Sequence, residues 1–199
     1  MLALTVFDIV LLAVLAFLAA ALGIWRARRR LLGNRRIGPM RSIVLFRTAT
    51  SDWDEDTLYG AIAKNAGPIE QSERAEMPKN RAVCYRVTLA DGTRIMLIDT
   101  DAPYVARRDE AARRFTQPAV RAAIAEHTTW TAIDLLGNSP SETATRDGMA
   151  LLGKLAAALD DGRTLLLHRR DLNRFALPTP TTFEALERGD LDAAFALPA

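Results

Sequence analysis

The sequence predicts an α+β domain with a mostly antiparallel sheet and helices packed on one face, ferredoxin-like or a variant, preceded by one transmembrane helix. Three observations support this fold class. Residues 2–25 form a long apolar run that ends in arginines. Residues 81–99 contain two strand-like arms on either side of an Asp-Gly pair, which is typical of a β-hairpin. Helical patterns lie between further strand-like segments, as in other α+β domains.

The apolar run at residues 2–25 is long enough to cross a bilayer. As a helix its 24 residues span about 36 Å, against a hydrocarbon core of about 30 Å. Asp8 is expected near the outer interface, because a carboxylate at the bilayer centre is costly. Trp25 suits the opposite interface, where aromatic rings collect. We therefore expect residues 1–25 to be a transmembrane anchor.

Arginines follow the apolar run, and no lysine or arginine precedes it. The seven that lie between residues 26 and 41 are Arg26, Arg28, Arg29, Arg30, Arg35, Arg36 and Arg41. The positive-inside rule places this side in the cytoplasm and the N-terminus outside. This pattern predicts a single-pass protein of the inner (cytoplasmic) membrane, with a basic juxtamembrane linker at 26–41 and a cytoplasmic domain at 42–199.

The basic linker is also expected to touch the membrane surface. Arginines close to a bilayer are attracted to anionic lipid headgroups by about 1 kcal/mol each. The predicted headgroup contacts are Arg26, Arg28, Arg29, Arg30, Arg35 and Arg36. Residues 42–199 carry 19 basic and 23 acidic side chains. The high isoelectric point therefore belongs to the linker, and no nucleic-acid binding is expected.

A cleaved secretory signal is the alternative interpretation of the N-terminus. Ala19, Ala20 and Ala21 could form a weak cleavage site. Cleavage would make the protein a secreted domain and would place its single cysteine, Cys84, in an oxidising compartment. Against this, the region before the apolar run lacks a basic side chain, and one cysteine cannot form an internal disulfide.

The first half of the domain is predicted to contain a strand, a helix and a hairpin. Residues 42–47 are apolar and β-branched, as in a strand. Leu58 and Ile62 lie on one face of a helix that begins near Asp54, and Gly67-Pro68 ends it. Residues 72–80 are polar and include Pro78, so an irregular connection is expected there. The hairpin at 81–99 is expected to turn at Asp91-Gly92 in a two-residue type I′ turn.

The second half is predicted to alternate helices and strands. Helices are expected at 109–115, 118–127, 142–159 and 183–187. Strands are expected at 128–136 and 164–168. The end of the chain, from Leu191 to Leu197, is expected to pack back on the domain.

Few residues offer catalytic or metal chemistry. The two histidines, His127 and His168, show no zinc-ligand spacing, and the chain has no phosphate-binding glycine motif. Asp99 and Asp101 are close enough in sequence to hold a cation, although aspartates at a strand end more often cap a loop. We therefore expect no metal, no cofactor and no assigned catalytic residue.

A resemblance to a family is carried by the C-terminal half. It covers the stretch from His127 to Gly137, the helical run 149–159, the strand-like run 164–168, and the segments Leu177-Pro-Thr-Pro and 185–190. This pattern resembles an uncharacterised bacterial α+β domain family of unknown function, over about residues 115–197. The resemblance implies an α+β fold and assigns no catalytic residue.

These observations predict a membrane-anchored protein whose cytoplasmic domain binds an unknown protein partner without catalysis. The alternative is a membrane-tethered, hydrolase-like enzyme with its site near His127, Trp130 and Asp134. Trp130 and Asp134 lie four residues apart in a predicted strand, so their side chains share one face. That arrangement is compatible with a site, and equally with a packed tryptophan and a surface acid.

Overall fold

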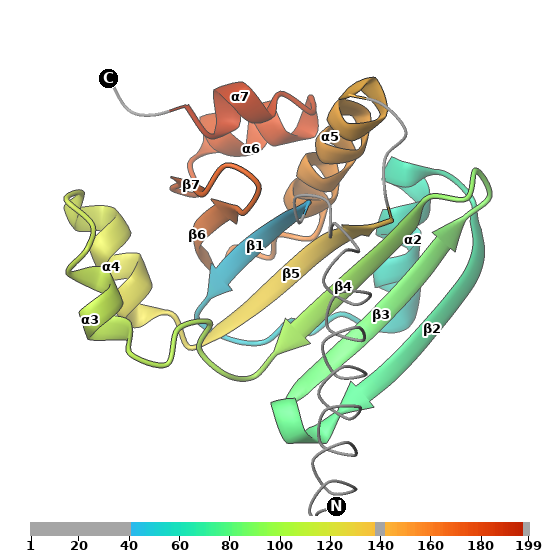
Figure 1. Cartoon of the computed structure of the whole chain (residues 1–199). Coiled ribbons are helices and arrows are strands. Elements are labelled where there is room, and N and C mark those ends of the chain that lie inside the picture. The colour runs from blue at the N-terminus through green and yellow to red at the C-terminus, as the bar shows by residue number, and fades with distance from the viewer. Residues whose placement is uncertain (1–40, 138–141, 197–199) are drawn as a thin grey trace, which may run out of the picture. The chain divides into compact units, whose positions relative to one another are not determined.

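The computed structural model describes residues 41–137 and 142–196, which form a domain around one seven-stranded sheet (Figure 1). Every neighbouring pair of strands is antiparallel, and the strand order is β2-β3-β4-β5-β1-β6-β7. The strands are β1 Ser42–Arg47, β2 Ile69–Met77, β3 Ala82–Leu89, β4 Arg94–Thr100, β5 Thr129–Leu136, β6 Thr164–Arg169 and β7 Arg174–Ala176.

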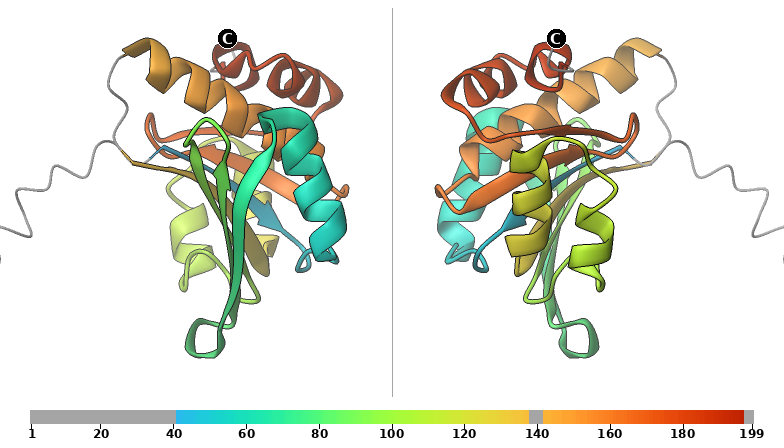
Figure 2. Two further views of the ribbon diagram at one scale, coloured as in Figure 1. Left: turned by 90° about the vertical axis from the view of Figure 1, so that its right-hand side faces the viewer. Right: turned by 90° about the vertical axis from the view of Figure 1, so that its left-hand side faces the viewer.

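Helices lie on both faces of this sheet (Figure 2). They are α2 Glu55–Ala66, α3 Arg108–Ala112, α4 Pro118–Glu126, α5 Glu142–Ala158, α6 Pro180–Glu187 and α7 Leu191–Ala194, with one 3₁₀ turn, η1, at Pro78–Asn80. Helices α2, α5, α6 and α7 pack on one face, and α3 and α4 pack on the other. Local signals place their starts: the Asp54 carboxylate accepts from the Thr57 N–H at 2.6 Å, and Pro118 occupies the first turn of α4.

The central strand β1 contributes to two separate cores. Ile43 and Leu45 point toward α2 and α5, whereas Val44 and Phe46 point toward α4. Successive side chains of a strand face opposite sides of a sheet, so a strand covered on both sides needs apolar residues at every position. The unbroken apolar run at residues 43–46 meets this requirement, and all of its side chains are buried.

The predicted hairpin is present, but its turn type differs from the prediction. The Leu89 N–H donates to the Thr93 carbonyl at 2.8 Å, and the Gly92 N–H donates to the Leu89 carbonyl at 2.9 Å. The loop therefore contains three residues, and only Gly92 among them has a positive φ, of 81°. A type I′ turn needs positive φ at both central residues, whereas this geometry is a type I turn followed by a glycine bulge.

The predicted irregular connection at residues 72–80 is wrong. Residues 69–77 form β2, which pairs with β3 from Ile69 to Met77, with an irregularity at Glu70. Pro78 starts η1 directly after the strand, and Arg81 then adopts a left-handed conformation with φ 50°. The proline therefore ends the strand without excluding it. The short edge strand β7 was not predicted either.

The predicted fold class also needs correction. A ferredoxin-like sheet with helices on one face does not describe a seven-stranded sheet with α3 and α4 on its second face. Among the helices of the described ranges, none combines the length and the apolar character that a membrane span requires, and this is where the predicted class fails. The segment 2–25, where that helix was expected, lies outside the described residues.

The other predicted elements are confirmed with small shifts of their ends. Strands β1, β5 and β6 and helices α2 to α6 all fall within the predicted segments or overlap them. Residues 191–195 pack on the domain as predicted, with Leu191 and Phe195 in the larger core, whereas Leu197 lies outside the described residues.

Candidate functional site

The face covered by α3 and α4 carries a cluster of aromatic rings. Phe46 lies at its centre, with ring centroids 4.8 Å from His127 and 5.1 Å from Tyr104. Tyr104 in turn meets Trp130 edge to face at 5.3 Å. The structure therefore brings together two of the three residues that the sequence offered as a site, His127 and Trp130.

Both ring nitrogens of His127 are already engaged in hydrogen bonds. Nδ1 lies 2.7 Å from the Ile124 carbonyl, to which it must donate, and Nε2 accepts from the Tyr104 N–H at 3.0 Å. The ring is fully buried, and burial lowers the pKa of His127, with the charge of Arg108 acting in the same direction. The ring therefore joins α4 to the loop before α3, and neither of its nitrogens is free to bind a substrate.

Asp134 lies at the opposite end of β5 from this cluster. Trp130 faces Phe46 across the ladder, whereas Asp134 faces Ser42 on β1 and Met96 on β4. The two side chains share a sheet face, as predicted, but four residues of a strand separate them by about 13 Å. His127, Trp130 and Asp134 therefore do not converge on one point.

Asp134 is nonetheless an unusual carboxyl group. It is 8% exposed, and neither its Oδ1 nor the Oγ of Ser42 opposite makes a hydrogen bond within the described residues. Burial raises the pKa of Asp134, and the nearby Ser42 hydroxyl and Arg170 charge offset this effect only in part. No imidazole hydrogen-bonds to either residue in the described part of the chain, so the pair is not a nucleophile with its base.

The second histidine, His168, also belongs to the packing of this face. Its ring stacks on Phe175 at 4.3 Å with an interplanar angle of 6°. Its Nε2 lies 3.1 Å from the Asn173 side-chain oxygen, which closes the β6–β7 hairpin. Burial lowers the pKa of His168, so this ring too is neutral near pH 7.

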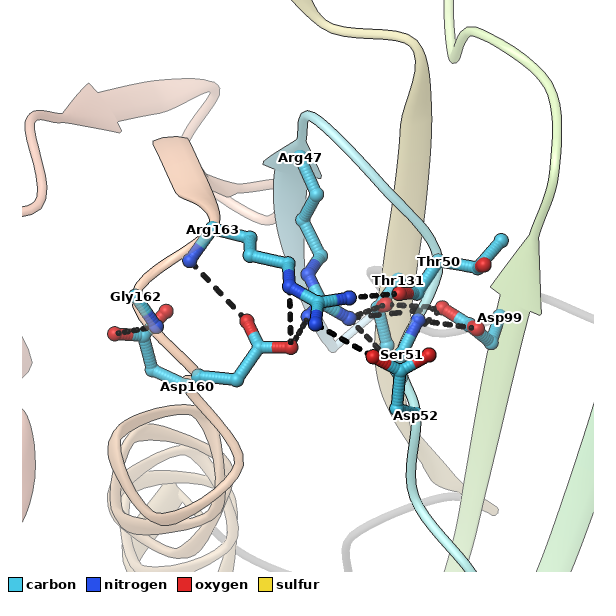
Figure 3. A network of polar contacts seen from close by, with 10 residues as sticks. Arg47, Thr50, Ser51, Asp52, Asp99, Thr131, Asp160, Gly162 and Arg163 are labelled. Atoms are coloured by element: carbon cyan, nitrogen blue, oxygen red, sulfur yellow. Dashed lines mark hydrogen bonds and ion pairs between the residues drawn. The ribbon is translucent and has the colours of Figure 1, made fainter.

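A polar network surrounds Arg47, which no sequence pattern had marked as a site residue (Figure 3). Arg47 ends β1, and its side chain is completely buried. Its guanidinium donates to the Thr131 hydroxyl at 3.2 Å and lies 3.8 Å from the Asp99 carboxylate. It also bonds to the Ser51 hydroxyl and to the Asp161 carboxylate.

Asp99 is the second centre of this network. Its carboxylate accepts from the Thr131 hydroxyl at 2.6 Å, from the Ser51 N–H at 3.0 Å and from the Ser51 hydroxyl at 3.2 Å. Arg163 extends the network to the Thr50 carbonyl at 3.0 Å and to the Asp52 carboxylate. The network thus ties together the ends of β1, β4 and β5, the loop after β1 and the turn before β6.

This geometry can hold the loop after β1 in place, but it lacks the parts of a catalytic centre. Ser51 has a carboxylate and a guanidinium beside it, and among residues 41–137 and 142–196 no imidazole or lysine hydrogen-bonds to it. Within the described residues, no group of three or more His, Cys, Asp or Glu side chains is placed to hold a metal ion. A charged residue at the end of an otherwise apolar central strand was the signal that could have revealed Arg47, because a buried charge requires partners.

The exposed edge of the sheet has a different character. Strand β2 is the terminal strand of the sheet and pairs only with β3 in the described part of the chain. It has nine residues and is mostly exposed, whereas β7 at the other edge has three. A terminal strand presents unpaired backbone N–H and C=O groups, which can pair with another extended chain.

Comparison with known proteins found no matching family model, no matching curated protein and no matching solved structure. The resemblance of residues 115–197 to an uncharacterised family therefore stays a prediction.

Proposed function

We propose that this chain is a non-catalytic binding protein whose domain takes an extended, basic segment of a protein partner on the open edge of β2. The observation that carries the proposal is the length of this edge. Along this nine-residue strand, about every second residue directs its backbone N–H and C=O groups away from β3 and toward a partner chain. Strand addition of this kind draws its affinity from main-chain hydrogen bonds and its specificity from alternate side chains.

The charge of β2 favours a basic partner. The strand carries Glu70, Glu73 and Glu76 against a single base, Arg74. Two of the acids have ion-pair partners, Arg86 with Glu73 at 3.2 Å and Arg74 with Glu76 at 2.9 Å. All of these side chains are exposed, so the existing pairs are weak and can exchange for pairs with a bound strand. Opposite charges directly across two strands stabilise their pairing.

A second copy of the chain fits this edge poorly. Antiparallel pairing of two β2 strands centred on Glu73 places Glu73 opposite Glu73. Like charges directly opposite each other destabilise a strand pair. The same charges therefore discourage edge-to-edge association of the protein with itself, which is a common role of charges on edge strands.

The test uses the full chain and a nine-residue peptide that alternates lysine and valine. We expect saturable binding by fluorescence anisotropy, together with slower hydrogen exchange of β2 amides in the complex. The variant Glu70→Lys with Glu76→Lys should weaken binding roughly fivefold or more, from two surface charges of about 0.5–1 kcal/mol each. The matched control, Glu110→Lys with Glu126→Lys, makes the same charge change on α3 and α4 and should bind as the wild type does.

Two results would overturn this proposal. The first is binding that is equal in both double variants, because the peptide would then be responding to net charge. The second is a complex in which the protected amides lie outside β2. A hydrolase activity that is lost on substitution of Trp130 or Asp134 would instead support the alternative, a membrane-tethered enzyme.

A further inference from the structure

Away from the β2 edge, the β3–β4 turn comes close to the end of β5 and the first turns of α5. A cavity of about 420 Å³ opens there, within the 300–1,000 Å³ range of small-ligand sites. Basic, acidic and apolar side chains all line this cavity. Two bases (Arg41 and Arg94), two acids (Asp91 and Asp147) and the leucines Leu135, Leu136 and Leu151 surround it.

The two guanidinium groups meet at one glycine. Arg41 is 7% exposed and donates from Nη2 to the Gly137 carbonyl. Nη2 of Arg94 lies 3.4 Å from the position that a Cβ on Gly137 would occupy. Gly137 has φ 99°, a conformation that favours glycine, and the missing side chain leaves room for this approach.

Arg94 is available to a ligand. Within the described residues, its guanidinium makes no hydrogen bond and no ion pair, and its side chain is exposed at the cavity. Guanidinium groups bind carboxylates with two parallel hydrogen bonds, so a carboxylate suits this end of the cavity.

The remaining lining selects among carboxylates. Asp91 stays ionised, because the Thr93 N–H donates to its Oδ1 at 2.8 Å and lowers the pKa of Asp91. Asp147 is exposed on α5 at the same cavity. These two acids complement a cation on the ligand, and the half-buried leucines offer an apolar surface. A ligand with a carboxylate, an ammonium group and an apolar side chain satisfies all three parts of the lining.

We propose that this cavity binds a small zwitterion of the apolar α-amino acid class. Its carboxylate lies between Arg41 and Arg94, its ammonium group faces Asp147, and its side chain lies on the leucines. This proposal is independent of the β2 edge, because it rests on other residues and a different kind of ligand.

Binding of leucine to the full chain, followed by NMR or calorimetry, tests the proposal. Leucine should bind saturably, whereas 4-methylpentanoate, which lacks the ammonium group, and 3-methylbutylamine, which lacks the carboxylate, should bind at least fivefold more weakly, from the loss of one charge-assisted hydrogen bond. Arg94→Gln should weaken leucine binding about tenfold or more. Asp147→Asn should weaken leucine binding and leave that of 4-methylpentanoate unchanged.

Arg113→Gln is the matched control, since it removes one exposed arginine on the far sheet face. It should bind leucine as the wild type does. The proposal is wrong if leucine does not bind up to about 10 mM, a concentration that detects affinities of only about 3 kcal/mol. It is also wrong if Arg94→Gln binds normally, or if 4-methylpentanoate binds as tightly as leucine.

Discussion

At the scale of single residues, the described domain is held by a few buried polar groups whose partners come from distant parts of the chain. Arg47 is the clearest case, since it bonds to Thr131 and Asp161 and lies beside Asp99. Trp53 adds a contact, with its ring centroid 5.4 Å from the guanidinium carbon. A buried cation of this kind stabilises the fold only while all of its partners are present.

Substitution of Arg47 should therefore be costly. Arg47→Met keeps much of the side-chain volume but leaves Asp99 and Asp161 without their shared cation. We expect the free energy of unfolding to fall by about 3 kcal/mol, measured by urea denaturation. The control Arg163→Met removes a guanidinium that is 38% exposed, and it should cost about 1 kcal/mol or less. Equal losses in the two variants would contradict the role given to Arg47.

The two buried histidines predict how stability depends on pH. Both have pKa values below the ordinary 6.5, because burial disfavours their charged forms. The unfolded chain then binds protons that the folded domain excludes, so the stability present above pH 6.5 is lost as the pH falls toward the folded pKa values. Urea denaturation between about pH 7.5 and 5 measures this slope. His168→Gln should make the slope shallower, and an unchanged slope would show that His168 does not contribute.

At the scale of secondary-structure elements, a glycine with positive φ ends helix α6 and sets the direction of the chain that follows. Gly189 follows α6 with φ 74°, and its N–H donates to the Leu186 carbonyl at 2.9 Å. The next N–H, of Asp190, reaches the Ala185 carbonyl at 2.8 Å. These two bonds form a Schellman motif, which ends the helix with a left-handed residue. The turn then leads into α7, so the position of Phe195 in the core depends on it.

Two glycine-to-alanine substitutions should have opposite effects on stability. Gly189→Ala puts a side chain on a left-handed residue, with its Cβ 3.0 Å from the Cβ of Ala150, and should cost about 1 kcal/mol or more. Gly60→Ala lies within α2, where a Cβ meets nothing within 4 Å, and should stabilise by about 1 kcal/mol. Thermal unfolding of both variants measures the two effects: the melting temperature should fall for Gly189→Ala and rise for Gly60→Ala. Destabilisation by Gly60→Ala would mean that α2 packs more tightly than described.

Strand β2 shows why an element can be missed from sequence. Its residues are mostly polar and exposed, so the alternation that marks a half-buried strand is absent. It forms a strand because β3 supplies a hydrogen-bonding partner for its backbone, and this pairing is part of the tertiary structure. The same cause leaves its other edge open and makes it the proposed binding surface.

At the scale of the whole molecule, the location of the protein stays a prediction, because it depends on residues 1–40, which lie outside the described part. We expect a reporter enzyme fused to the C-terminus to be active in the cytoplasm, and the intact mass to show an uncleaved chain, because the arginines that follow residue 25 favour the cytoplasmic side. An exported reporter with a chain cleaved near Ala21 would support the secreted alternative. The control removes four of these charges. Changing Arg26, Arg28, Arg29 and Arg30 to Gln should lower the fraction of chains whose C-terminus is in the cytoplasm.

The α+β class, the hairpin at 81–99 and most helices could be predicted from the sequence, because periodicity and end signals are local properties of the chain. The sequence also identified His127, Trp130 and Asp134, but it could not show that Asp134 lies far from the other two along β5. The three-dimensional structure is needed to see that helices cover both faces of the sheet, that Arg47 is buried beside acids from two distant segments, and that β2 is an open edge. The reason is physical: strand partners, burial and ion pairs depend on segments far apart in the chain, and no local pattern of residues encodes which of them meet.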